Sequence, residues 1–146
     1  MTAPFSLDLW VPGAPVSKGR PRATARGGKV RTFTPAKTRN YENLVKLEAG
    51  RMMAGATPIE GPIRLHVTAN LQIPASWSKK KQASALDGSL LPTSRPDVDN
   101  YAKAVLDALN EVVFRDDSQV VQLIAGKRYS ERPGLSIRIE TMEAGS

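Results

Sequence analysis

The segment from Ile63 to Ile73 constrains the fold of this chain most, because its apolar and polar residues alternate without a break. The apolar positions are Ile63, Leu65, Val67, Ala69, Leu71 and Ile73, and the polar positions between them are Arg64, His66, Thr68, Asn70 and Gln72. A period of two places every second side chain on one face, as in a half-buried β-strand. The chain must therefore form a sheet around this segment. His66 lies on the polar face, where we expect an ordinary surface histidine with no catalytic role.

Similar patterns predict the remaining elements. Alternation predicts strands at residues 5–11, 118–129 and 134–142, with Pro12-Gly13 ending the first and a turn around residues 131–134 joining the last two. Helical spacing predicts a helix at about residues 37–53, with a stripe of Tyr41, Leu44, Val45, Glu48 and Met52. A second helix, starting near Asn100, has the stripe Tyr101, Ala104, Val105, Ala108, Leu109 and Val112.

The order of these elements is β-α-β-α-β-β. Residues 74–96, bounded by two prolines, form an excursion from this pattern that can hold a short helix in residues 76–88. We therefore expect an α+β fold in which one mixed β-sheet carries two main helices. A chain of 146 residues fits a single domain, residues 1–146, with a frayed tail at residues 143–146.

Composition excludes several classes of site. The chain has no cysteine and one histidine, so disulfides, thiolate catalysis and cysteine-type zinc sites are excluded. Any bound metal would be a hard ion with oxygen ligands, which favours Mg²⁺ or Mn²⁺. No apolar run approaches the ~20 residues that span a bilayer, so we expect no membrane association. The start of the chain does not resemble a signal peptide, and we expect a cytoplasmic location.

Positive charge is concentrated in one segment of a chain whose formal net charge is +7. Residues 17–39 contain eight Lys and Arg residues, no acidic residue and several glycines, so we expect a flexible cationic loop. A phosphate-binding arm explains this pattern better than a solvated basic loop, which stays as the alternative. The DNA-binding candidates are Lys18, Arg20, Arg22, Arg26, Lys29 and Arg31, together with Arg95. Weaker basic clusters lie at residues 78–82 and at Lys127, Arg128 and Arg132.

Two acidic pairs flank the second helix. Asp97 and Asp99 point about 200° apart in a helix but to the same side in an extended segment, which Pro96 favours for the residue before it. We expect Asp97 to end an extended approach and Asp99 to lie at or near the N-cap. Asp116 and Asp117 precede the next strand and would fold back beside the helix start if that strand runs antiparallel to the helix.

Each acidic residue also has a purely structural explanation. Asp97 or Asp99 could cap the helix, Asp99 and Lys103 could form a surface ion pair on the helix face that also carries Asp107, and Asp116-Asp117 could be a turn. Together, however, the carboxylates form an acidic cluster in a basic protein, where like charges repel unless a cation is bound. A metal ion bound by these carboxylates beside a DNA phosphate would resolve that conflict.

The motif "DVDNYAK" at residues 97–103, followed by Asp107, Leu109 and "DDSQV" at residues 116–120, resembles the RusA family of Holliday junction resolvases. The early "VPGAPVSKGRPR" is similar to the first strand and basic turn of that family. The resemblance implies that Asp97, Asp99 and Asp117 bind the metal, that Asp116 is an accessory ligand and that Lys103 is the catalytic lysine. It also implies a homodimer, dependence on Mg²⁺ or Mn²⁺, and paired nicks across a four-way junction.

We therefore expect a metal-dependent, structure-specific DNA endonuclease that resolves Holliday junctions in recombination and repair. Two paired nicks need two active sites, which a two-fold symmetric dimer provides. Two alternatives remain: a nuclease acting on flaps or forks, and a non-catalytic DNA-binding protein whose acidic residues are structural.

Overall fold

The computed structural model describes residues 5–17, 22–26, 29–33 and 36–142. Its strands are β1 (Ser6–Pro12), β2 (Arg22–Arg26), β3 (Lys29–Phe33), β4 (Ile63–Gln72), β5 (Val120–Ser130) and β6 (Gly134–Thr141). Its helices are α1 (Ala36–Met53), α2 (Lys79–Asp87) and α3 (Val98–Leu109), and a single 3₁₀ turn, η1 (Asp117–Gln119), precedes β5. None of the helices in these ranges is both long and apolar enough to span a membrane.

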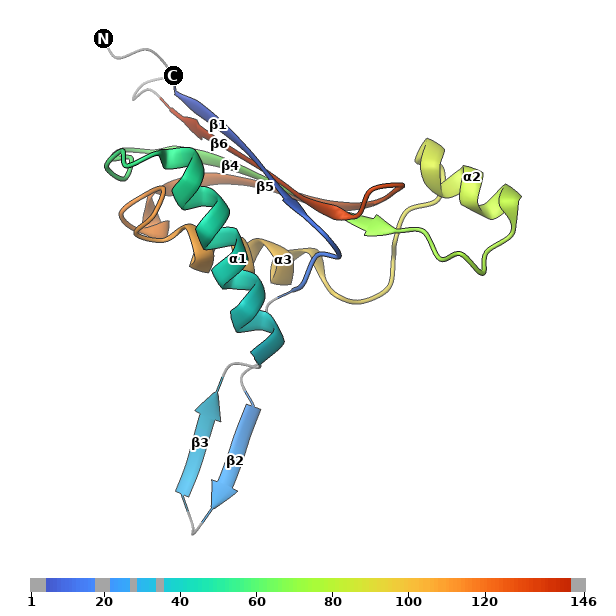
Figure 1. Ribbon diagram of the computed structural model, residues 1–146, viewed down its shortest axis with the longest axis horizontal. Coiled ribbons are helices and arrows are strands. Elements are labelled where there is room, and N and C mark those ends of the chain that lie inside the picture. The colour runs from blue at the N-terminus through green and yellow to red at the C-terminus, as the bar shows by residue number, and fades with distance from the viewer. Residues whose placement is uncertain (1–4, 18–21, 27–28, 34–35, 143–146) are drawn as a thin grey trace.

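The main sheet has four strands in the order β1-β6-β4-β5. β6 runs antiparallel to both β1 and β4, whereas β4 and β5 are parallel, so the sheet is mixed. Figure 1 shows α1 and α3 packed on one face of this sheet and α2 projecting beyond its end. The predicted α+β fold with a mixed sheet is therefore confirmed, and the excursion holds the short helix that was expected within it.

The core lies between the sheet and the two main helices. The predicted alternation in β4 is confirmed, because Ile63, Leu65, Val67 and Ala69 are all buried. In α3 the predicted stripe is buried from Tyr101 to Leu109. The strands thus supply a flat apolar layer and α3 supplies the ridge that packs on it.

The buried stripe of α1 differs from the prediction. Tyr41 and Val45 are buried as expected, but Leu44 and Met52 are exposed. The remaining buried positions are Ala49 and Met53, so the stripe advances strictly by four residues. Residues four apart form a straight ridge along a helix, and the small Ala49 lets this ridge lie close to its neighbours.

The expected flexible loop at residues 17–39 is corrected by the structure. Residues 22–26 and 29–33 pair as an antiparallel β-hairpin, with Arg26 opposite Lys29, and α1 begins at Ala36. Gly27-Gly28 joins the two strands in the sequence, and such a pair is a hairpin signal because tight two-residue turns require positive φ angles. Figure 1 shows the hairpin extending away from the start of α1.

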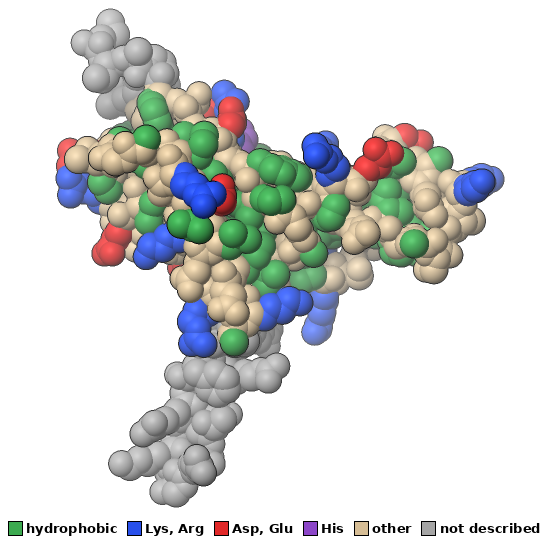
Figure 2. Space-filling model, viewed as in Figure 1, with side chains coloured by type: hydrophobic (Ala, Val, Ile, Leu, Met, Phe, Trp, Pro, Cys, Tyr) green, Lys and Arg blue, Asp and Glu red, His purple; other side chains and the backbone are tan. Residues whose placement is uncertain are grey.

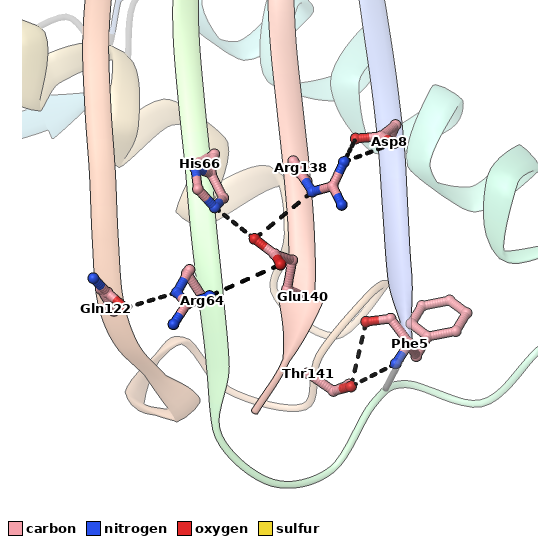
Figure 3. Close-up of polar contacts among 8 residues, drawn as sticks. All are labelled: Phe5, Asp8, Arg64, His66, Gln122, Arg138, Glu140 and Thr141. Atoms are coloured by element: carbon pink, nitrogen blue, oxygen red, sulfur yellow. Dashed lines mark hydrogen bonds and ion pairs between the residues drawn. The ribbon is translucent and has the colours of Figure 1, made fainter. Parts of the chain in front are cut away.

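The face of the sheet away from the helices is polar and carries a network of ion pairs (Figure 3). Glu140 Oε1 lies 2.6 Å from His66 Nε2 and 3.7 Å from Arg138 Nε. The other carboxylate oxygen of Glu140 lies 3.9 Å from the Arg64 guanidinium group. Arg138 in turn reaches Asp8 at 3.4 Å. His66 thus lies on the polar face as predicted, but it has an acidic partner, Glu140, 74 residues further along the chain.

The projecting α2 unit is attached through aromatic contacts. The Trp77 ring meets Tyr129 of β5 edge to face, with their centroids 5.2 Å apart, and Lys81 Nζ lies 4.1 Å from the Trp77 ring centre. Ser78 caps α2 by accepting a hydrogen bond from the Lys81 backbone, and Gly88 ends the helix at φ 86°. Basic side chains occupy the far tip of this unit in Figure 2.

Candidate active site

The first acidic pair lies at the start of α3. Asp97 is the N-cap, with extended backbone angles (φ −70°, ψ 150°), and its side chain makes no capping hydrogen bond. Asp99 lies in the first turn of the helix and is exposed. The extended position of Asp97 confirms the prediction, but the N-cap is Asp97 and not Asp99, so the helix begins two residues earlier than expected.

Lys103 lies one turn beyond Asp99 on the exposed side of α3. In the part of the chain that the structure describes, Asp99 and Lys103 do not form an ion pair with each other. The capping and ion-pair explanations of Asp97 and Asp99 therefore have no support from the observed contacts. Both carboxylates remain directed at solvent, where they can meet a cation.

The chain before α3 is held in place by β5. Lys127 Nζ donates hydrogen bonds to the carbonyl oxygens of Ser94 at 2.6 Å and Pro96 at 3.0 Å. This contact fixes the approach to Asp97, beside a cavity of about 460 Å³ lined by Arg95, Pro96, Asp97 and Asn100. Within the weak basic cluster of Lys127, Arg128 and Arg132, Lys127 thus has a structural role, because its ammonium group is bound to backbone oxygens.

The second acidic pair lies in η1. The Asp116 carboxylate accepts hydrogen bonds from the backbone and hydroxyl of Ser118, and Gln119 Oε1 accepts one from the Asp116 backbone at 2.9 Å. The Ser118 hydroxyl, followed by its backbone N–H, lowers the pKa of Asp116 below its ordinary value, because both stabilise the carboxylate. Asp117 is exposed beside this capping box. The turn that was the structural alternative for this pair is thus present, and of the two carboxylates only that of Asp116 bonds within it.

Gln119 fixes the position of η1. Its Nε2 donates to the carbonyl oxygens of Ile59 at 2.9 Å and Gly61 at 3.0 Å, just before β4 begins. The Ile59 backbone also bonds to Val113, which follows α3 in the sequence. Asp117 therefore lies near the end of α3, whereas Asp97 lies at its start.

The two acidic pairs are far apart within one chain. The 12 residues of α3 separate them, a length of about 18 Å. β5 does run antiparallel to α3, but this direction places Asp117 beside the end of the helix, so the expected fold-back to the helix start does not occur in one chain. Within the described ranges, no three acidic or histidine side chains are arranged to hold a metal ion.

The basic candidates fall into three groups. Lys18 and Arg20 lie outside the described residues. Arg22 and Arg26 belong to β2, and Lys29 and Arg31 belong to β3, where the register places all four at positions of the same face of the hairpin. Arg95 lines the cavity beside Asp97.

Comparison with known families assigns the chain. The family described as Endodeoxyribonuclease RusA matches residues 12–140. The chain belongs to this family. It is also similar to "Uncharacterized protein YqaN" of Bacillus subtilis (strain 168), with 44% identity over 140 residues that cover 94% of this chain and 98% of that protein. The resemblance seen in the motifs at residues 97–103 and 116–120 is thus confirmed over most of the chain.

Two residues without a predicted role position the acidic segments: Lys127, which no motif marked, and Gln119, which belongs to the motif "DDSQV". Lys127 supports the segment before Asp97, and Gln119 anchors the segment that carries Asp117. Gln119 follows Asp116 by three residues, which is the capping-box spacing and was a usable signal. Lys127 had no such signal, because its partners are backbone oxygens more than 30 residues away.

Proposed function

We propose that this RusA-family chain is a metal-dependent endonuclease that resolves four-way DNA junctions by paired, symmetric nicks. The observation that carries the proposal is the state of Asp97, which holds the N-cap position of α3 without using its carboxylate as a cap. A side chain at this position normally bonds to the helix N–H groups, so leaving it free is a cost to the helix. A bound cation would offset that cost.

The donor set suits a hard divalent ion. Asp97 and Asp99 offer carboxylate oxygens, the ligand type that Mg²⁺ and Mn²⁺ prefer, and Asp117 would complete the set with Asp116 as an accessory ligand. An ion bound there would polarise the phosphate and lower the pKa of an attacking water. Asp116 is the weaker candidate, because its carboxylate already accepts two hydrogen bonds from Ser118.

The neighbouring basic residues would position the DNA. Lys103 lies one turn from Asp99, so its ammonium group can stabilise the negative charge that develops on the cleaved phosphate. Arg95 lines the cavity beside Asp97 and can hold a flanking phosphate. The hairpin of β2 and β3 contributes four further basic positions for the DNA backbone.

We propose a homodimer because the two acidic pairs are separated within one chain. β5 is an edge strand of the main sheet, and it exposes the apolar side chains of Val121, Leu123 and Ile124. An unpaired edge with exposed apolar residues favours pairing with another strand. If two copies meet along β5 around a two-fold axis, the start of one β5 lies beside the end of the other.

This arrangement would complete the metal site. The start of β5 carries Asp117, and its end carries Lys127, which holds the approach to Asp97. Antiparallel pairing of β5 with its copy therefore moves Asp117 of one subunit toward Asp97 and Asp99 of the other.

The experiment is cleavage of a synthetic four-way junction with end-labelled strands. We expect paired nicks at symmetric positions with Mg²⁺ or Mn²⁺ and none with EDTA. Flap and fork substrates of the same sequence serve as controls, and faster cleavage of those substrates would assign the chain to flap or fork processing. Junction binding without cleavage under any metal would show a non-catalytic DNA-binding protein.

A further inference from the structure

On the open face of the sheet, Trp10 lies across a glycine. Trp10 belongs to β1, points away from the buried Leu9 and Val11, and is 43% exposed. A Cβ atom at Gly134 would lie 2.3 Å from two carbon atoms of the Trp10 ring, so only glycine lets the ring rest on the backbone there. The indole ring is thus supported from below and accessible from solvent.

On the same face of the sheet, two strands away from Gly134, lies an arginine held by a buried amide. Gly134 pairs with Asn70 of β4, and Asn70 pairs with Arg128 of β5, so these positions form one row across the sheet. Asn70 is only 2% exposed, and it is the one buried polar residue in the described part of the chain. Its Nδ2 donates to the Gly134 carbonyl at 3.2 Å and to Ser136 Oγ at 3.1 Å, and its Oδ1 accepts Arg128 Nε at 2.9 Å.

Arg128 differs in its surroundings from the other arginines of this face. Arg64 and Arg138 lie within 4 Å of Glu140, and Arg138 also pairs with Asp8. Among the described residues, no carboxylate lies within that distance of Arg128, which is bound through Nε alone and is exposed. The rest of its guanidinium group is therefore oriented and available to an anion.

We propose that Trp10, Asn70 and Arg128 form a platform for single-stranded DNA, in which an unpaired base stacks on Trp10 and an adjoining phosphate binds Arg128. Stacking on aromatic rings beside a cation is how proteins hold single strands without reading their sequence. A base inside a duplex is already stacked on both faces, so the ring selects nucleotides that are unpaired. The inference rests on the proposed function, because the open centre of a branched junction would supply such nucleotides.

The test uses the fluorescence of Trp10. The chain has two tryptophans, so a Trp77→Phe variant leaves Trp10 as the only tryptophan, which is excited at wavelengths that tyrosine does not absorb. We expect a single strand of about a dozen thymidines to quench this emission by stacking on the ring, whereas a blunt duplex leaves it unchanged. EDTA is present throughout, so neither a metal ion nor cleavage enters the measurement.

Substitutions then separate stacking from charge. Trp10→Leu keeps an apolar side chain on the sheet but removes the aromatic face, and we expect roughly tenfold weaker binding of the single strand, while Trp10→Phe keeps most of the affinity. Arg128→Ala should flatten the salt dependence by about 0.7 in log K against log salt, the value for one phosphate of a single strand. Arg128→Lys should keep that slope but bind less tightly, because lysine cannot reproduce the bond from Nε to Asn70.

Arg138→Ala is the matched control, because it removes the same charge from the same face at a site already paired with Asp8 and Glu140. It should leave single-strand binding unchanged. Equal binding of the Trp10→Leu variant and the parent protein would overturn the platform, as would equal losses for Arg128→Ala and Arg138→Ala. A junction that binds but is never cut would overturn the proposed function instead, and would leave the fluorescence result standing.

Discussion

Individual carboxylates around α3 are used in different ways. Asp116 accepts two hydrogen bonds from Ser118, which lower its pKa, and so it stabilises the turn before β5. Asp97 has no capping bond, and Asp99 is exposed in the first turn of the helix. The carboxylates that fold the chain are thus distinguishable from those that are free for chemistry.

Asp99→Asn should abolish junction cleavage and leave junction binding intact or tighter. The substitution removes one negative charge from the proposed metal site and one source of repulsion toward phosphate. Cleavage is followed with Mg²⁺ present, and binding is measured with EDTA. The control is Asp8→Asn, which changes a carboxylate on the opposite face of the sheet, and this variant should cleave junctions at the wild-type rate. Unchanged cleavage by the Asp99→Asn variant would contradict the assignment of Asp99 to the metal site.

Tyr41 makes the stability of the protein sensitive to alkali. Burial, followed by the nearby Tyr101, raises the pKa of Tyr41 to about 12, against an ordinary value of 10.0. The folded state therefore holds this proton more tightly than the unfolded chain does. The resulting stabilisation is complete below pH 10 and is lost as the pH rises from 10 toward 12, by up to roughly 3 kcal/mol.

Tyr41→Phe should remove this part of the alkaline loss. The Val16 backbone lies near the Tyr41 hydroxyl and opposes part of the rise in its pKa, but the buried hydroxyl makes no hydrogen bond of normal geometry in the described part of the chain. At pH 7 the variant should therefore be as stable as the wild type or more stable. Urea unfolding at pH 7 and at several values between 10 and 12 measures both effects. A parallel decline of the two proteins above pH 10 would show that other groups cause the loss.

At the level of elements, the hairpin of β2 and β3 is separate from the main sheet, and each of its strands pairs with the other alone. Its register places Arg22, Arg26, Lys29 and Arg31 at positions of one face. One face of the strand pair therefore gathers four basic positions, and basic residues are the type that contacts DNA phosphates.

Arg22→Ala combined with Arg26→Ala should weaken binding to junctions and to linear duplexes alike, because phosphate contacts carry no sequence information. For two lost contacts to duplex DNA, the slope of log K against log salt should flatten by about 1.8. Lys46→Ala combined with Arg51→Ala removes the same charge from α1 and should change the slope less. Loss of junction preference at an unchanged slope would instead place the hairpin at the branch point.

For the whole molecule, the separation of the acidic pairs across α3 predicts that each metal site is shared between two subunits. In a heterodimer of Asp99→Asn and Asp117→Asn subunits, one shared site would contain both substitutions and the other would contain neither. Mixing the two inactive variants should therefore restore nicking, at one position per junction. The experiment needs subunit exchange, which differently tagged subunits would reveal.

The control mixes Asp99→Asn with Asp97→Asn, two substitutions that always fall in the same half of a site. This pair should stay inactive, because every shared site then contains one damaged carboxylate. Continued inactivity of the Asp99 and Asp117 pair, despite proven subunit exchange, would place all ligands of a site in one subunit. Sedimentation as a monomer at micromolar concentration would contradict the shared site more directly.

Local patterns were sufficient for most of the fold. The alternation in β4 and the stripe in α3 predicted buried faces that the structure confirms, since both depend only on the period of the backbone and on the removal of apolar side chains from water. The hairpin was missed because its strands have only five residues each, with mostly basic residues at one set of alternate positions and small residues at most of the other, so no strong apolar alternation marks them. Gly27-Gly28 was the signal for it, and we interpreted these glycines as flexibility.

The candidate site depended on contacts between distant segments. The sequence placed Asp97, Asp99 and Lys103 at one helix start, because their spacing is local. It did not predict that Gln119 ties the second acidic pair to Ile59 and Gly61, at the opposite end of α3 from Asp97. Nor did it predict that Lys127 holds the approach to α3, or that Asn70 orients Arg128. Such positions depend on how strands and helices pack in three dimensions, and no residue period along the chain encodes them.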